Sequence, residues 1–131
     1  MLSVILAVCL STAISESSLN QSYADAYRES VRDHKPLMVV VGAPYCPACK
    51  VLKQTTIQPM AATGELRDVS VAVVDKERDP KLAERLTGGE KLLPQIIVFS
   101  QDASGAWKRR KLLGYQPKQP VRSLIRRARG R

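Results

Sequence analysis

Two cysteines separated by two residues, Cys46 and Cys49, are the residues best suited to chemistry in this chain. At the start of a helix, this spacing brings the two sulfur atoms within disulfide-bonding distance. The unpaired N–H groups and the positive end of the helix dipole lower the pKa of the first thiol below its free value of about 8.5. We therefore expect Cys46 to be the nucleophile. Cys49, one turn further along, is expected to be less exposed and to resolve the mixed disulfide.

The cysteine pair has two other interpretations, a zinc site and a structural disulfide. A zinc site needs two further ligands, and the other candidates are Cys9 and His34. His34 lies between Asp33 and Lys35 at a predicted helix end, where the dipole favours a solvated histidine over a catalytic base. A structural disulfide would close a very short loop and stabilise the fold little. Exchange chemistry is favoured, with no metal ion and no organic cofactor required.

The residues around the cysteines predict a strand followed by a helix. Residues 37–41 form a continuous apolar, largely β-branched run, which is typical of a strand buried on both faces. Gly42-Ala43-Pro44-Tyr45 interrupts the run, and residues 46–53 have helical character, with Pro47 tolerated in the first turn. The dithiol is therefore expected at a strand-to-helix junction.

The other elements follow from the periodicity of the apolar residues. An apolar residue recurs every four positions from Leu19 to Val31, which predicts a helix whose apolar face is ordinary core. Further strands are expected over 69–75, 95–99 and 107–113, and further helices over 80–86 and 120–128. The last two strands are predicted to pair as an antiparallel hairpin. Helices and strands alternate, so a sheet covered on two faces is expected.

Composition and charge limit the remaining choices. With 131 residues, 44% hydrophobic and 25% charged, the chain is suited to a single packed domain and not to a disordered or fibrous protein. The net charge of +9 comes from its end, because residues 103–131 carry ten of the 21 bases and none of the 12 acids. The basic character therefore does not define the function of the whole domain.

The first ten residues are nearly all apolar. Spanning a bilayer takes about 20 residues, whereas the apolar region of a secretory signal needs only about 7–15. We predict a signal-like segment over 1–15, a domain over 16–131, and export to the periplasm or outside the cell, which would also remove Cys9. No Lys or Arg precedes the run, so a buried strand and a misassigned start are alternatives, and an N-terminal membrane anchor is another. Leu6-Ala7-Val8-Cys9 also resembles a lipoprotein cleavage box, but Val8 is bulkier than the small residue expected there and the charged region is missing for this signal as well.

The residues around the dithiol resemble a known family. Residues 43–50, Ala-Pro-Tyr-Cys-Pro-Ala-Cys-Lys, are similar to the active-site signature of thioredoxins, with Tyr45 in place of the usual Trp and Pro47-Ala48 in place of Gly-Pro. Asp75, Leu93-Pro94 and Gly114 also fall in the thioredoxin order, and the resemblance covers roughly residues 22–128. It implies an α/β thioredoxin fold with a central mixed sheet of four to five strands flanked by helices.

The resemblance also implies roles for particular residues. Pro94 would be the cis-proline that faces the dithiol, and the Leu93 backbone would pair with an extended substrate strand. We expect Tyr45 to contact substrate as well. Three neighbours of the cysteines would support the site, namely Pro44, Pro47 and Ala48. The implied partners are protein thiols and disulfides and a redox partner protein, and the implied protein is a monomer.

The chain departs from the thioredoxin pattern at two buried positions. Val40 and Val71 stand where thioredoxins carry an Asp and a Lys that help to move the proton of the resolving cysteine. Proton transfer through water or through another acid would then replace the usual relay.

The basic C-terminal end has several interpretations. Trp107 beside four consecutive bases, residues 108–111, could mark a nucleic-acid surface. Basic residues on an edge strand also discourage aggregation, and we favour this second interpretation because only 5% of residues are aromatic and no nucleic-acid-binding motif is present. The arginines after residue 121 suit a solvated helix face and allow weak contact with an anionic membrane surface. The competing function is a non-enzymatic binding module that holds an acidic partner.

Overall fold

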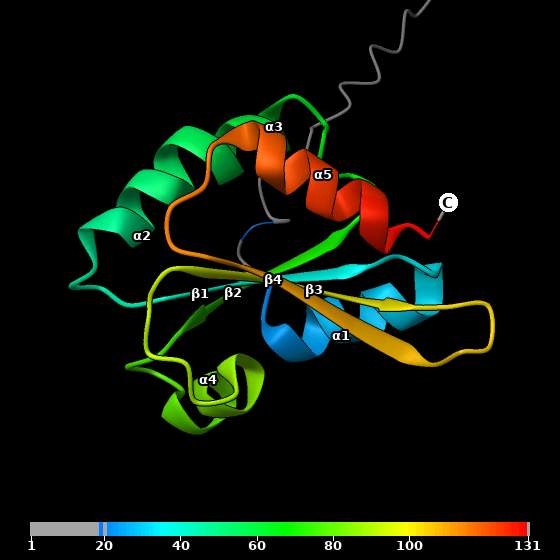
Figure 1. The fold of residues 1–131 in the computed structure, drawn as a ribbon, viewed down its shortest axis with the longest axis horizontal. Coiled ribbons are helices and arrows are strands. Elements are labelled where there is room, and N and C mark those ends of the chain that lie inside the picture. Colours follow the sequence, from blue (N-terminus) through cyan, green and yellow to red (C-terminus); the bar gives the residue numbers. More distant parts are fainter. Residues whose placement is uncertain (1–18, 20, 131) are drawn as a thin grey trace, which may run out of the picture.

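The computed structural model describes Leu19 and residues 21–130, and it places helices on both sides of one sheet (Figure 1). The helical elements are α1 (Tyr23–Asp33), α2 (Pro47–Leu52), a π-helical segment η2 (Lys53–Ile57), α3 (Gln58–Ala62), α4 (Pro80–Thr87) and α5 (Lys118–Ala128). The strands are β1 (Leu37–Gly42), β2 (Ser70–Asp75), β3 (Gln95–Gln101) and β4 (Trp107–Leu113). The predicted signal-like segment and Cys9 lie outside the described residues. Within the described part of the chain, no helix is long and apolar enough to cross a membrane.

The four strands form a mixed sheet in the order β2–β1–β3–β4. β1 pairs in parallel with β2, Val39 lying opposite Ala72, and antiparallel with β3, Val39 lying opposite Ile97. β3 and β4 form the predicted antiparallel hairpin. The carboxyl ends of β1 and β2 and the amino end of β3 therefore meet at one edge of the sheet, and this is the edge where α2 begins.

Each face of the sheet carries its own apolar cluster. Alternate residues of β1 point to opposite faces, which explains why the whole run 37–41 is buried, as predicted. One face packs against the layer of α2, η2, α3 and α5, and the other packs against α1 and α4. In α5 the predicted apolar face is confirmed, and it consists of Val121, Leu124 and Ile125 together with Ala128.

The apolar face predicted for the first helix is confirmed only at its start, where Leu19 and Tyr23 are half-buried and pack against the core. α1 buries Ala26 and Ser30, whereas Tyr27 and Val31 are 42% and 44% exposed. Four residues advance 400° around an α-helix, so a stripe repeating every four positions drifts by 40° per step away from the sheet. Ala26 and Ser30 are small and allow the helix to approach β2 closely. The hydroxyl of the buried Ser30 has a hydrogen-bond partner, because Ser30 Oγ donates to the Lys35 carbonyl.

The helical segment after the dithiol is longer than predicted. It continues from α2 through η2 and α3 to Ala62, rather than ending near Lys53. Pro59 has no N–H to donate to the carbonyl four residues before it, and the wider π-helical turn lies just there. Thr56, which is fully buried in this turn, donates to the Gln116 carbonyl over 2.7 Å. This bond joins the cysteine-bearing segment to the loop before α5.

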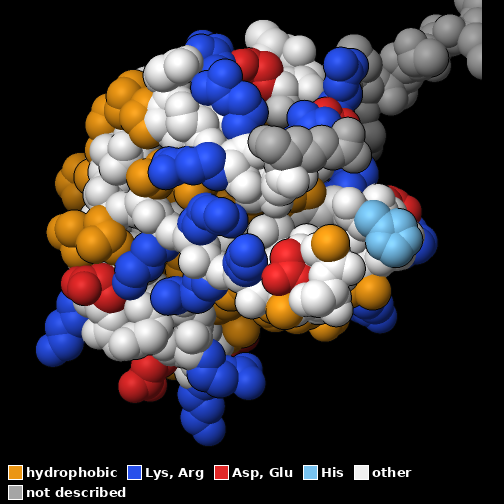
Figure 2. Space-filling view, turned by 45° about the vertical axis from the view of Figure 1, so that its right-hand side comes forward, with side chains coloured by type: hydrophobic (Ala, Val, Ile, Leu, Met, Phe, Trp, Pro, Cys, Tyr) orange, Lys and Arg blue, Asp and Glu red, His pale blue; other side chains and the backbone are white. Residues whose placement is uncertain are grey.

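Basic side chains gather over the face formed by β4 and α5 (Figure 2). β4 is an edge strand, paired only with β3 in the described residues. Trp107 stacks on Tyr27 with the ring centroids 6.0 Å apart, and Arg109 donates to the Leu86 carbonyl at the end of α4 over 2.6 Å. Trp107 and Arg109 of β4 thus make contacts within the protein. These contacts agree with the interpretation of the basic residues of β4 as protection of an edge strand.

Arg122 of α5 forms an ion pair with Glu65 in the segment between α3 and β2. The guanidinium Nε and Nη2 donate to the two carboxylate oxygens. This hydrogen bonding, assisted by the Thr63 hydroxyl, holds the pKa of Glu65 below its ordinary value of 4.5. The pair connects α5 to the loop that leads into β2.

Arg122→Gln is expected to destabilise the protein at neutral pH but not in acid. Because the pKa of Glu65 is lowered by folding, the pair stabilises the fold above the unfolded pKa, and this contribution disappears as pH falls through the lower folded value. The measurement is the free energy of unfolding in urea at pH 7 and below pH about 4. Arg28→Gln, which breaks the well-exposed Arg28–Asp25 pair, is the control and should change little. A deficit that persists in acid would assign the stabilisation to packing of the Arg122 side chain.

Candidate active site

Cys46 and Cys49 lie where β1 passes into α2, as predicted, and they are joined by a disulfide bond. Cys46 is the N-cap of α2, its backbone N–H closes the preceding turn on the Ala43 carbonyl over 3.2 Å, and Pro47 occupies the first turn. The Cα atoms of the two cysteines are 5.3 Å apart. Both residues are half-buried in this disulfide-bonded form.

The sulfur of Cys46 takes the place of a capping oxygen at the helix start. The backbone N–H of Cys49 donates to Cys46 Sγ over 3.2 Å. After reduction, the same N–H and the positive end of the helix dipole favour a thiolate on Cys46 over a protonated thiol. Pro47 removes one N–H from the first turn, but it leaves this one in place.

Gly42, the last residue of β1, packs its backbone against Cys49. A Cβ at this position would lie 3.2 Å from both Cβ and Sγ of Cys49. Gly42 does not need a left-handed backbone, so close approach and not conformation is the reason for glycine here.

Gly42→Ala is expected to shift the dithiol–disulfide equilibrium toward the reduced form. In the disulfide the Cys49 sulfur is held beside the new methyl group, whereas a free thiol can rotate away from it. The change should be roughly tenfold in the equilibrium constant with glutathione, as for other overpacked sites. Thermal unfolding of the oxidised and of the reduced proteins is the control. The oxidised variant should lose more stability than the reduced one, because the contact with Cys49 Cβ remains after reduction whereas the contact with Sγ can be relieved. An unchanged constant would show that the β1 backbone yields without affecting Cys49.

The other residues implied by the resemblance lie at the same edge of the sheet. Pro94 directly precedes Gln95, which is paired with Val41, so Pro94 lies at the end of the sheet where Gly42 and the dithiol are. Pro94 is buried, its peptide bond with Leu93 is cis, and its carbonyl accepts from the Gly114 N–H over 2.7 Å. Leu93 is half-buried.

Tyr45, the predicted substrate contact, and the three predicted supporting residues differ in exposure. Tyr45 is 65% exposed, Pro44 and Pro47 are exposed, and Ala48 is half-buried. Tyr45 therefore presents its ring to solvent next to the dithiol, where a partner protein can reach it.

Three exposed apolar residues at this edge were missed in the sequence, namely Leu92, Leu113 and Tyr115. Leu113 is paired with Gln95, and the Tyr115 hydroxyl lies 3.3 Å from the hydroxyl of Thr55. Hydrogen bonds to Thr55 and Thr56 lower the pKa of Tyr115 below its ordinary value. Their positions could have identified them in the sequence, because each lies at or within three residues of the end of a predicted strand.

Val40 and Val71 are both buried, at 6% and 4% exposure, in the apolar cluster on the α2 and α5 side of the sheet. The two positions that carry the proton relay in thioredoxins are thus filled by apolar packing. Any proton leaving Cys49 must take another route.

His34 lies away from the dithiol, at the other end of β1. It is exposed and caps the carboxyl end of α1 with a left-handed backbone, φ 53°. Among Leu19 and residues 21–130, no cluster of three or more His, Cys, Asp or Glu side chains is arranged to hold a metal ion. The structure therefore does not bring His34 and the two cysteines together.

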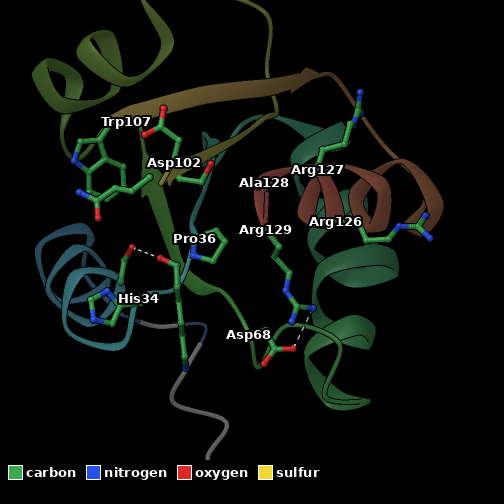
Figure 3. Close-up of a pocket in the computed structure, with 13 residues that line it drawn as sticks. His34, Pro36, Asp68, Asp102, Trp107, Arg126, Arg127, Ala128 and Arg129 are labelled. Atoms are coloured by element: carbon green, nitrogen blue, oxygen red, sulfur yellow. Dashed lines mark hydrogen bonds and ion pairs between the residues drawn. The ribbon is translucent and has the colours of Figure 1, made fainter. Parts of the chain in front are cut away.

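A recess of about 620 Å³ also lies at this far end of the sheet (Figure 3). Trp107, His34 and Pro36 line it, and Arg129 at its border pairs with Asp68 over 3.4 Å. The side chains of Arg126 and Arg127 point away from the recess (Figure 3). The recess thus has no part in the chemistry of the dithiol.

Comparisons with known proteins agree with this geometry. A model of the family described as thioredoxin-like matches residues 18–100. No curated protein matches the chain. A thioredoxin from Thermus thermophilus superposes with a TM-score of 0.71 at 21% identity, over 86% of this chain and 88% of the other. The thioredoxin of Trichomonas vaginalis gives 0.65 at 16% identity, over 86% and 98%, and chloroplastic thioredoxin z gives 0.65 at 20%, over 86% and 95%.

The superpositions show the fold alone. The family model covers more than half of the chain, including β1, the cysteine turn and β3 up to Ser100. The mixed sheet, the helix that begins at a Cys-x-x-Cys pair and the proline before β3 are all present in this one chain. The chain belongs to the thioredoxin-like family.

Proposed function

We propose that the protein exchanges disulfides with other proteins through Cys46 and Cys49. The observation that carries the proposal is the cysteine pair at a helix start, close enough to form a disulfide, with the Cys49 N–H donating to Cys46 Sγ. Exposed apolar side chains at the same edge of the sheet, such as Tyr45 and Leu92, favour a protein as the substrate.

Reduction of a substrate takes two steps. The Cys46 thiolate attacks one substrate sulfur, the substrate disulfide breaks, and the departing thiolate takes up a proton. The Cys49 thiolate then attacks Cys46 Sγ, releases the second substrate sulfur and closes the Cys46–Cys49 disulfide. Two electrons and two protons pass from the dithiol to the substrate. Oxidation of a substrate dithiol runs the same steps in reverse, and the reduction potential sets the direction.

Reduction of insulin tests the proposal. With dithiothreitol as the electron source, the full chain should accelerate precipitation of the insulin B chain. A titration against glutathione then decides whether the protein serves better as reductant or oxidant. The lack of any catalysis, together with a dithiol that does not react with glutathione disulfide, would rule the proposal out.

A binding module that holds an acidic partner is the second candidate. The basic side chains over β4 and α5 favour it (Figure 2). Arg126→Gln with Arg127→Gln separates the two functions, because both side chains are exposed whereas shortening the chain would remove the buried Ala128. Insulin reduction should be unaffected by this double change. Loss of reduction would place the basic end in the function.

We also propose that the chain is exported, that it acts as a monomer and that it makes only weak contact with anionic membranes. The apolar run 2–10 and the small residues after it support export. The mature N-terminus is then expected between Ala13 and Asn20, and a chain beginning at Ser15 should keep its activity and melting temperature. Mass spectrometry of the native protein checks this. An intact Met1 in a soluble cytosolic fraction would contradict it, and a retained, membrane-bound N-terminus would favour an anchor.

A further inference from the structure

Gln95 is a fully buried polar residue at the edge of the sheet that carries the dithiol. It is the first residue of β3, it follows Pro94 directly, and it is 0% exposed. Its side-chain Nε2 donates to the Glu90 carbonyl over 3.1 Å and to the Leu92 carbonyl over 3.0 Å. Both hydrogens of the amide are therefore used on the segment that leads to Leu93.

That segment, residues 88–92, has few other connections to the body of the protein. All five of its residues are exposed. Its other backbone hydrogen bonds stay within the segment or run back to the end of α4. Gly88 and Gly89 donate to the Glu84 carbonyl, Glu90 donates to the Thr87 carbonyl over 3.4 Å, and Leu92 donates to Glu90 Oε1 over 3.5 Å. Gln95 thus provides the link from this segment to the sheet.

The orientation of the Gln95 amide follows from its partners. A carbonyl oxygen accepts and cannot donate, so the NH₂ group must face Glu90 and Leu92. The opposite atom, Oε1, is buried and has no hydrogen-bond partner in the described residues. A side chain that leaves one buried polar atom unpaired in order to hold two loop carbonyls is unfavourable as core filling alone.

The segment held by Gln95 borders the place where a protein substrate would pair. The Leu92 carbonyl belongs to the peptide unit just before Leu93, and a recess of about 250 Å³ beside it is lined by Glu90, Lys91 and Leu93 together with α4. A shift of Leu92 would move both the backbone of Leu93 and the wall of this recess.

We propose that Gln95 is a positioning residue that holds residues 90–93 in register for pairing with an extended segment of a protein substrate. The inference rests on the proposed function, since it assigns the residue that adapts the same site to polypeptides. Gln95 touches neither cysteine in this role. Small disulfides, which need only the cysteine sulfurs, should react without its help.

Gln95→Met tests this, because methionine has a similar length and fills the core without donating hydrogen bonds. We expect kcat/KM for insulin to fall about tenfold, mainly through KM, since two buried carbonyls lose their donor and the loop shifts. Reaction with bis(2-hydroxyethyl) disulfide and the rate of Cys46 alkylation should be unchanged. Ser70→Ala is the matched control, because it removes a buried hydroxyl without a hydrogen-bond partner from the far end of the sheet. It should change the rate neither with insulin nor with the small disulfide.

Gln95→Glu gives an independent arm if the methionine variant does not fold. An ionised carboxylate repels the two carbonyl oxygens, whereas a protonated one donates to one of them. The insulin rate, divided by the rate with the small disulfide, should therefore recover toward the wild-type ratio as pH falls, while Ser70→Ala shows no such recovery. This ratio corrects for the thiol chemistry, which itself depends on pH.

The outcomes are distinct. Wild-type protein that reduces neither substrate, and whose dithiol does not react with glutathione disulfide, would overturn the proposed function itself. Wild-type protein that reduces both, with Gln95 variants that retain the wild-type rate on insulin, would overturn only the role of Gln95. Equal losses on insulin and on the small disulfide would also overturn it, because they would assign Gln95 to the general stability of the site.

Discussion

Cys46→Ser is expected to abolish disulfide exchange altogether. A serine hydroxyl is not ionised at neutral pH, so the N–H of Cys49 and the helix dipole have no thiolate to stabilise and the first step has no nucleophile. Insulin reduction should fall to the uncatalysed rate with dithiothreitol. The melting temperature of Cys46→Ser should match that of Cys49→Ser, because both variants lose the same disulfide.

Cys49→Ser should behave differently, because it keeps the nucleophile and loses the resolving thiol. Mixed disulfides between Cys46 and its substrates should then accumulate and be visible by non-reducing electrophoresis. The order of alkylation of the reduced wild-type protein at mildly acidic pH provides a check. Faster labelling of Cys49 than of Cys46, or trapping by Cys46→Ser instead, would reverse the two roles.

Leu52→Ala is expected to produce the second large effect, a loss of about 2–5 kcal/mol in the free energy of unfolding. Leu52 is the last residue of α2, it is 0% exposed, and it belongs to the cluster that packs this helix on the sheet. Truncation removes the buried side chain that anchors the cysteine-bearing helix to the core. The measurement is urea unfolding of the oxidised and of the reduced protein.

Val51→Ala is the matched control, because Val51 is adjacent in the same helix but 45% exposed. Its change should stay within about 0.5 kcal/mol. If the two variants lost equal stability, α2 would be held by its connections to β1 and η2 and not by the Leu52 side chain. Such a result would also weaken the view that the core of the sheet fixes the position of the dithiol.

The pattern of apolar residues predicted burial correctly where a strand or helix packs most of its apolar side chains into the core. The run 37–41 could be assigned to a doubly buried strand because every position is apolar, and only a central strand covered on both sides buries all of them. The face of α5 built from Val121, Leu124 and Ile125 was equally clear. The hairpin of β3 and β4 followed from the turn residues between two β-prone runs.

Periodicity misled where burial depends on close approach. In α1 the small residues Ala26 and Ser30 face the sheet, and the larger Tyr27 and Val31 remain exposed. A hydrophobicity pattern assigns the larger apolar residues to the core, but a helix lying close to a strand leaves room only for small ones. The choice between the two faces is made by the distance between helix and sheet, which no local pattern contains.

The chemistry of the site was determined by the sequence itself, because the Cys-x-x-Cys spacing and the strand-to-helix change around it are local features. Which residues surround the dithiol was decided only by the tertiary structure. Gly42 contacts Cys49 because β1 ends beside α2, and Gln95 holds the segment before Pro94 through carbonyls five and three residues earlier in the chain. A glutamine next to an apolar strand gives no sign of being buried until its two acceptors are in place. Backbone carbonyls are present at every residue, so only the folded path of the chain selects which of them a side chain reaches.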